Sequence, residues 1–237
     1  MPIARRRPVW TLRSAALAVA VRTRARPRPP AGRRLLRFDR ALESPFVAGA
    51  DEAGRGALAG PLVTAAVLFD HRRLAGPACA PLALLDDSKR LSHESREELF
   101  QAVCEAALRV CVRVFPAGVI DQRGVHYANL RGLASALAGV DAPAGAVLLS
   151  DGFRLPLERT HRAVIGGDGR SAALAAASIV AKVTRDRLML REHDRFPRYG
   201  FLEHVGYGTP QHLLALELHG PCELHRWSFS PIAQRAT

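Results

Sequence analysis

The chain has 237 residues, 48% of them hydrophobic, so it is long and apolar enough to build a folded core. This composition excludes disorder as the general state, because disordered chains lack the apolar side chains that a core requires. The formal net charge is +12 at pH 7. A charge of this size favours nucleic acid or an anionic membrane as the partner.

The charge is concentrated near the N-terminus. Residues 1–40 contain 12 Arg and one Asp, which gives +11, whereas residues 41–237 sum to +1. Prolines 27, 29 and 30 break helices, since they lack a backbone N–H. We therefore expect a mobile Arg/Pro-rich arm over 1–43 and one folded domain over 44–237. Three interpretations of the arm stay open: a binding arm, a transit-like leader, and the product of a misassigned start codon.

No apolar run reaches the roughly 18 residues that a membrane-spanning helix needs. The segment 14–21 resembles a signal-peptide core, but Arg and Pro follow it without a convincing cleavage site. The four cysteines form no CxxC pair, which is typical of reduced thiols in the cytosol. We expect a cytoplasmic protein in which Cys104 and Cys111 are buried.

From Phe46 onward, short apolar runs alternate with helical patterns, which is typical of an α/β fold. Strands are expected at 46–50 and 62–69, paired antiparallel across a glycine-rich turn. An amphipathic helix at 92–108 precedes a third strand at 110–115. A second helix is expected at 121–137.

Two more short strands follow, at 146–151 and 163–167. Small apolar residues then recur at helical spacing between Ala172 and Val183, which predicts a closely packed helix. A helical segment from about residue 198 ends the chain and includes a helix at 209–218.

Acidic residues stand at the ends of these strands. Asp51 ends the first strand and precedes Glu52, Asp151 ends the fourth, and Asp168 follows the fifth. Strand ends at one edge of a sheet lie close together, so we expect the acids to converge. Converging carboxylates raise one another's pKa unless a cation such as Mg²⁺ or Mn²⁺ binds them. The acids therefore predict a two-metal site suited to phosphodiester hydrolysis.

Each feature also has a simpler interpretation. Asp168 alone fits a helix N-cap, and Asp151 alone fits a turn residue. The turn Gly54-Arg55-Gly56 fits a tight hairpin connection, although its missing side chains also let backbone approach a ligand. The joint placement of the acids favours the metal site.

The chain carries eight motifs in one order: DEAGRG (51–56), LAGP (58–61), DSKRLS (87–92), SDG (150–152), GD (167–168), AAASIVAKVTRDRLM (175–189), GYGT (206–209) and HRWSF (225–229). Together they closely resemble the ribonuclease HII family, the type 2 ribonucleases H, from about residue 46 to the end. The resemblance implies an α/β ribonuclease H-like mixed sheet flanked by helices, with a C-terminal helical segment.

The resemblance also implies an activity. It is the hydrolysis of the RNA strand of RNA/DNA hybrids and the nicking of duplex DNA 5′ of an embedded ribonucleotide, leaving 3′-hydroxyl and 5′-phosphate ends. Two divalent ions, Mn²⁺ or Mg²⁺, would be bound by four catalytic acids: Asp51, Glu52, Asp151 and Asp168. The expected partners are RNA/DNA hybrid and ribonucleotide-containing duplex DNA, with no membrane, and the protein is expected to be a monomer.

The substrate-binding residues implied by the resemblance are Gly54, Arg55, Gly56, Lys89, Ser178, Lys182 and Tyr207. The backbone of the first three would contact the ribose 2′-hydroxyl, which distinguishes RNA from DNA. Tyr207 would bond the same hydroxyl and stack on the next deoxyribose. Lys89 would meet phosphate, Ser178 would assist that contact, and Lys182 would meet phosphate or pair with a carboxylate. Asp186 is interpreted as a structural ion-pair partner.

Two competing functions remain. Another nuclease of the same fold would share the acids but lack the GRG turn and Tyr207. A non-catalytic RNA-binding protein using the Arg arm would lose binding without the arm and tolerate neutralisation of Asp151. His219, Cys222 and His225 have ligand-like spacing, but they are too few for a closed zinc site.

Overall fold

The computed structural model describes residues 30–86 and 91–235. Its centre is a five-stranded sheet with the order β3-β2-β1-β4-β5. The strands are β1 (Phe46–Ala53), β2 (Leu62–Asp70), β3 (Arg109–Phe115), β4 (Val147–Asp151) and β5 (Arg162–Val164). β1 pairs antiparallel with β2 and parallel with β4, so the predicted hairpin and mixed sheet are confirmed.

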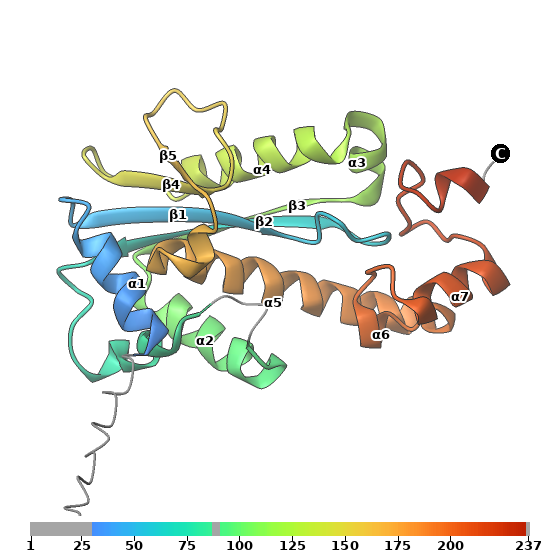
Figure 1. Cartoon of the computed structure of the whole chain (residues 1–237), viewed down its shortest axis with the longest axis horizontal. Coiled ribbons are helices and arrows are strands. Elements are labelled where there is room, and N and C mark those ends of the chain that lie inside the picture. Colours follow the sequence, from blue (N-terminus) through green and yellow to red (C-terminus); the bar gives the residue numbers. More distant parts are fainter. Residues whose placement is uncertain (1–29, 87–90, 236–237) are drawn as a thin grey trace, which may run out of the picture.

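Helices cover both faces of the sheet (Figure 1). The α-helices are α1 (Ala31–Arg40), α2 (His93–Ala106), α3 (Ala117–Arg123), α4 (Val125–Gly139), α5 (Ala172–Arg195), α6 (Phe201–His204) and α7 (Pro210–His219). Short 3₁₀ helices are η1 (Pro77–Leu84), η3 (Gly167–Gly169), η4 (Pro197–Tyr199) and η5 (Ala233–Arg235). Within the described ranges, no helix combines the length and the apolar character needed to cross a membrane.

Side chains of β1 alternate between two hydrophobic cores. Val47 packs into the core that α5 and α2 share, whereas Ala48 faces Leu133 and Leu137 of α4. This alternation follows from the two-residue period of a strand, and it requires a central strand without polar residues at these positions.

α5 approaches β1 at backbone distance. A Cβ placed on Gly49 would lie 2.5 Å from the carbonyl carbon of Ala173, so no larger residue fits there. The first turns of α5, from Ala172 to Ala177, are buried and consist of alanine except for Leu174, in line with the close packing that the sequence predicts. This contact fixes where α5 crosses the sheet. It thereby also fixes the position of Ser178, which follows Ala177 on the same helix.

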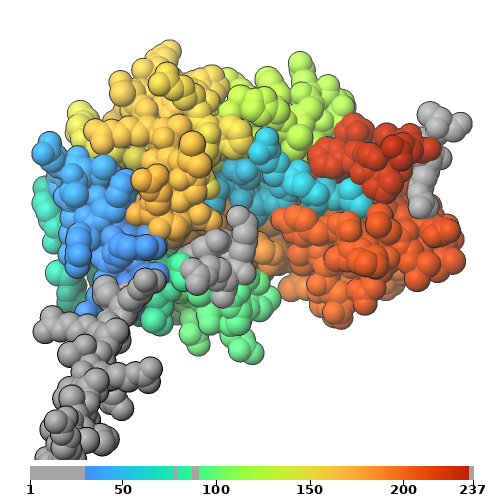
Figure 2. Space-filling view, in the orientation of Figure 1, coloured from blue at the N-terminus to red at the C-terminus, as the bar shows by residue number. Residues whose placement is uncertain are grey.

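The expectation of a mobile arm over 1–43 is wrong for residues 31–40, while 1–29 lie outside the described residues. α1 buries Leu35, which is 1% exposed, against the α5 side of the sheet. Asp39 accepts the N–H of Ala173 at 2.9 Å, and Arg34 donates to the carbonyl of Gly169 at 3.2 Å. In Figure 2 the blue surface of α1 accordingly meets the orange segment that leads into α5. The arginines occupy the outer side of α1 and obscure this packing in the sequence.

Three smaller expectations also change. The single helix predicted at 121–137 is two helices, α3 and α4, that meet at Gly124. β1 continues to Ala53, so Asp51 lies within the strand rather than at its end. Cys111 is buried as predicted, but Cys104 is exposed on α2.

Replacing Leu35 with Ala should reduce the free energy of unfolding by about 3 kcal/mol, because the substitution leaves a cavity beneath α1. Leu84→Ala is the control, since that side chain is 62% exposed and should change stability little. Denaturant unfolding measures both variants. Equal stability of Leu35→Ala and the wild type would contradict the packing of α1.

Candidate active site

Three aspartates meet at one edge of the sheet. Asp51 on β1, Asp151 at the end of β4 and Asp168 in η3 each offer a carboxylate oxygen, and these oxygens lie within 4.8 Å of one another. The parallel pairing of β1 with β4 aligns Ala50 with Ser150, so the next residue of each strand is an aspartate. The predicted convergence of these three acids is therefore present.

Backbone amides orient all three carboxylates. Asp51 accepts the N–H of Glu52 at 2.8 Å, and Asp151 accepts that of Gly167 at 2.9 Å. Asp168 accepts the N–H of Gly169 at 2.8 Å.

The simpler interpretation of Asp168 as the N-cap of α5 does not hold. Ser171 occupies the cap position, and its hydroxyl accepts the N–H of Leu174 at 3.3 Å. Asp168 lies three residues earlier, in η3, where its carboxylate faces the other two aspartates. Its placement thus serves the acid cluster rather than the helix end.

The cluster is costly to ionise without a cation. Burial raises the pKa of Asp51 well above its ordinary value, and the charges of Glu52 and Asp151 raise it further. A hydrogen bond from Ser178 acts in the opposite direction on that pKa. A donor set of carboxylate oxygens under mutual repulsion fits a hard divalent cation such as Mg²⁺ or Mn²⁺.

A pocket of about 250 Å³ opens at these acids. Its lining holds ten of the eleven residues expected at the site: Asp51, Glu52, Gly54, Arg55, Gly56, Asp151, Asp168, Ser178, Lys182 and Tyr207. Glu52 borders the pocket without belonging to the group of three aspartates. The eleventh residue, Lys89, lies outside the described residues.

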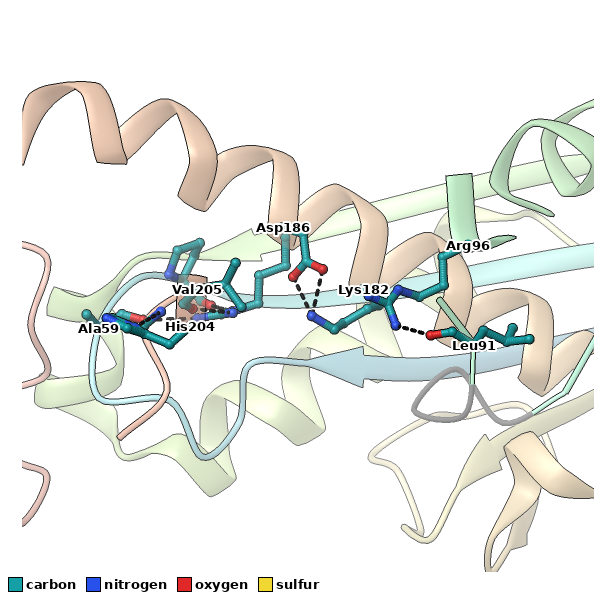
Figure 3. A network of polar contacts seen from close by, with 10 residues as sticks. Ala59, Leu91, Arg96, Lys182, Asp186, His204 and Val205 are labelled. Carbon is teal, nitrogen blue, oxygen red and sulfur yellow. Dashed lines mark hydrogen bonds and ion pairs between the residues drawn. The ribbon is translucent and has the colours of Figure 1, made fainter. Parts of the chain in front are cut away.

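The buried Arg185 of α5 supports the GRG turn from behind. A Cβ on Gly54, which has φ +85°, would lie 1.9 Å from Nε of Arg185, so only glycine fits. The guanidinium donates to the carbonyls of Ala59, Pro61 and Val205 at 2.9–3.0 Å. Ala59 and Val205 lie together in Figure 3, although they come from different loops. Arg185 therefore joins the chain after the GRG turn to the chain before GYGT.

A second buried guanidinium, that of Arg226, completes this support. It donates to the carbonyl of Gly60 through Nε at 3.1 Å and Nη2 at 3.0 Å. Nη1 donates to the carbonyl of Arg55 at 2.9 Å, inside the GRG turn. The roles of Arg185 and Arg226 are not predictable from residue type, because arginine is usually exposed and the backbone carbonyls that accept from them are common to every residue. Their places within TRDR and HRWSF were the available signal.

Lys182 and Asp186 form an ion pair on α5 (Figure 3). The Nζ atom lies 2.5 and 2.6 Å from the two carboxylate oxygens. Burial lowers the pKa of Lys182, whereas the hydrogen bond from it to Asp186 raises that pKa. The interpretation of Asp186 as an ion-pair partner is confirmed, and the pair holds the Lys182 ammonium at the pocket wall.

Asp51→Asn should stabilise the protein in EDTA, because it removes a buried charge while keeping an acceptor for the Glu52 amide. A carboxyl whose pKa is raised by folding loses stability as the pH rises above its unfolded pKa. The difference in Tm from the wild type should therefore grow between pH 4 and pH 8, to about 3 °C or more. Thermal unfolding across this range measures it.

Asp141→Asn is the matched control, since Asp141 is exposed and pairs with Arg109 away from the acids. Added Mg²⁺ or Mn²⁺ should raise the Tm of the wild type and of Asp141→Asn more than that of Asp51→Asn. Equal cation responses in all three proteins would contradict a cation site at the aspartates.

Comparisons with known proteins agree with this geometry. The family model for ribonuclease HII matches residues 48–232. Ribonuclease HII of Rhodococcus opacus is 51% identical over 188 residues, covering 79% of this chain and 80% of that relative. Ribonuclease HII of Mycobacterium bovis is 48% identical over 210 residues, covering 85% and 77%.

Solved structures give the same result. The ribonuclease H2 of Pyrococcus horikoshii matches with a TM-score of 0.66 and 25% identity, covering 80% of this chain and 96% of that one. The ribonuclease HII of Archaeoglobus fulgidus, solved in complex with PCNA, matches with a TM-score of 0.63 and 26% identity, covering 78% and 95%. With a family model over most of its length and relatives at about half identity, the chain belongs to the ribonuclease HII family.

Proposed function

We propose that this protein is a metal-dependent endoribonuclease that hydrolyses the RNA strand of RNA/DNA hybrids. We include the nicking of duplex DNA 5′ of an embedded ribonucleotide, which leaves 3′-hydroxyl and 5′-phosphate ends. The observation that carries the proposal is the group of three aspartates within 4.8 Å in the pocket that also contains the GRG turn and Tyr207.

The proposed metal ligands are Asp51, Asp151, Asp168 and, from the border of the pocket, Glu52. Two divalent ions bound there, Mn²⁺ or Mg²⁺, supply activation of the attacking water and stabilisation of the leaving oxygen. The backbone bonds to the aspartates hold the carboxylates in place, which limits the reorganisation needed on binding.

The proposed ribose reader is the GRG turn. The close approach of Gly54 to Arg185 and the bond from Arg226 to the Arg55 carbonyl keep the turn in one conformation. The backbone of Gly54, Arg55 and Gly56, which line the pocket, then contacts the ribose 2′-hydroxyl, the group that DNA lacks.

Tyr207 would bond the same 2′-hydroxyl and stack on the following deoxyribose. Arg185 lies with Cζ 5.1 Å from the centre of its ring, which supports the ring from one side. Lys89, Lys182 and Ser178 are the proposed phosphate contacts. The Lys182 ammonium is already oriented by Asp186.

The competing functions differ in what they require. A nuclease of the same fold without ribose selection does not need a GRG turn and Tyr207 beside the acids, but both line this pocket. A non-catalytic RNA-binding protein does not need three aspartates in mutual repulsion. The monomeric state and the cytoplasmic location expected from the sequence belong to the proposal, and size-exclusion chromatography tests the first.

The full-length protein should nick a DNA duplex that contains one ribonucleotide when Mg²⁺ or Mn²⁺ is present. Asp151→Asn should reduce kcat by about a hundredfold or more, because a metal ligand is lost. Tyr207→Ala should reduce kcat/KM on this duplex by about tenfold. Gel analysis of the labelled strand measures the rate and the position of cleavage.

Asp141→Asn, whose side chain is remote from the pocket, should cut at the wild-type rate. An all-DNA duplex should stay intact in every reaction. If the wild-type protein leaves the ribonucleotide-containing duplex intact with both cations, the proposed function is wrong. If Asp151→Asn cuts as fast as the wild type, the assignment of the acids is wrong.

A further inference from the structure

Three histidines form a buried group in the C-terminal core, and the proposed chemistry uses none of them. His204 is 5% exposed, and His212 and His225 are fully buried. The rings of His204 and His212 are stacked with their centres 4.4 Å apart. The Nε2 atoms of His212 and His225 lie 3.0 Å apart, at hydrogen-bonding distance.

The hydrogen-bond partners of His212 determine which of its two ring nitrogens carries the proton. Its Nδ1 atom lies 3.0 Å from the carbonyl oxygen of Tyr207, which accepts only. Nδ1 must therefore carry the proton, and Nε2 of the neutral ring is left as an acceptor. The proton between the two rings then belongs to Nε2 of His225.

The partners of His225 agree with this assignment. Its Nδ1 lies 2.9 Å from the N–H nitrogen of Cys222 and 3.3 Å from the carbonyl oxygen of the same residue, so the shorter contact is the one in which Nδ1 accepts. The reverse assignment would place two acceptors, Nδ1 of His212 and the carbonyl of Tyr207, 3.0 Å apart. A single direction of donation thus runs from Cys222 through His225 and His212 to Tyr207.

The rings remain neutral at physiological pH. Burial lowers the pKa of both His212 and His225 to about 4, and at His212 the hydrogen bond to the Tyr207 carbonyl offsets only part of that effect. Electrostatic repulsion from His212 lowers the pKa of His225 further, and that from His204 lowers both pKa values. A proton added to Nε2 of His212 would face the N–H of His225 and break the series of bonds.

The loop before Tyr207 needs such support. Val205 has φ +43°, in the left-handed region that a β-branched residue adopts only under strain. Arg185 holds the Val205 carbonyl, and Nδ1 of His204 accepts the N–H of Gly206 at 3.2 Å. His212 supplies the contact at Tyr207 itself.

We propose that His212, oriented by His225, is a positioning residue that fixes the backbone of Tyr207 and thereby the reading of the RNA–DNA junction. This inference rests on the proposed function of the same pocket. His212 touches no reacting atom and acts through Tyr207 alone. We therefore expect substrate preference to change in variants that lose the donor to the Tyr207 carbonyl and to persist in variants that keep it, whatever their overall stability.

Isosteric replacements separate the two nitrogens of His212. The amide nitrogen of Asn reaches the position of Nδ1, whereas that of Gln reaches the position of Nε2. His212→Asn should lose less than about threefold in kcat/KM on the single-ribonucleotide duplex. His212→Gln should lose about tenfold or more, because a small displacement of a binding group is costly. Cleavage of an all-RNA/DNA hybrid should fall less, since it presents no junction at the scissile site.

The same logic gives a second pair at His225. His225→Gln keeps a donor toward Nε2 of His212, and His225→Asn does not. His225→Gln should therefore keep more of the preference for the single ribonucleotide. This pair decides the question if His212→Gln fails to fold, and the Tm of every variant is measured beside its kinetics.

A double-mutant cycle completes the test. In the Tyr207→Ala background, His212→Gln should cause no further loss of kcat/KM, because the ring whose position depends on His212 is already absent. Additive losses of kcat/KM in the double mutant would overturn the inference. Equal losses of kcat/KM in His212→Asn and His212→Gln, in proportion to their loss of Tm, would overturn it as well. If the wild-type protein cuts no substrate, the proposed function fails instead, so the two failures are distinguishable.

Discussion

The backbone contact between α5 and β1 governs the placement of the whole site. Gly49 lets the first turns of α5 lie directly on the strand, and Asp51 follows two residues later on the same face. Ser178 is therefore within hydrogen-bonding reach of Asp51. The same helix continues to Lys182 and Arg185, so one rigid element carries residues for the acids, the pocket wall and the loop support. A bulkier residue at position 49 would displace all of them together.

The substrate-facing loops are held from within the protein by bonds to backbone carbonyls. Arg185 and Arg226 together contact the carbonyls of Arg55, Ala59, Gly60, Pro61 and Val205. Burying a guanidinium is costly unless its donors are satisfied, and these carbonyls satisfy them. The two arginines also place positive charge behind loops that would face a polyanion. Structural support and electrostatic attraction thus come from the same groups.

The sequence predicted the features that depend on patterns of residue type. Short apolar runs that alternate with helical patterns predicted the sheet. The acids at the predicted strand ends led us to expect that Asp51, Asp151 and Asp168 converge. It did not predict α1, because the charge of Arg33, Arg34 and Arg37 outweighs a short apolar stripe in any composition average. The loop supports were also missed, because their partners are main-chain atoms that every residue possesses.

The bond from Asp39 to Ala173 joins residues that are 134 positions apart. A ribosome releases the chain from its N-terminus, so α1 emerges long before α5, the helix that Asp39 contacts. Until then the core around Leu35 is incomplete, because it includes residues of α5. The core that Leu35 enters can consequently be completed only after α5 has been synthesised.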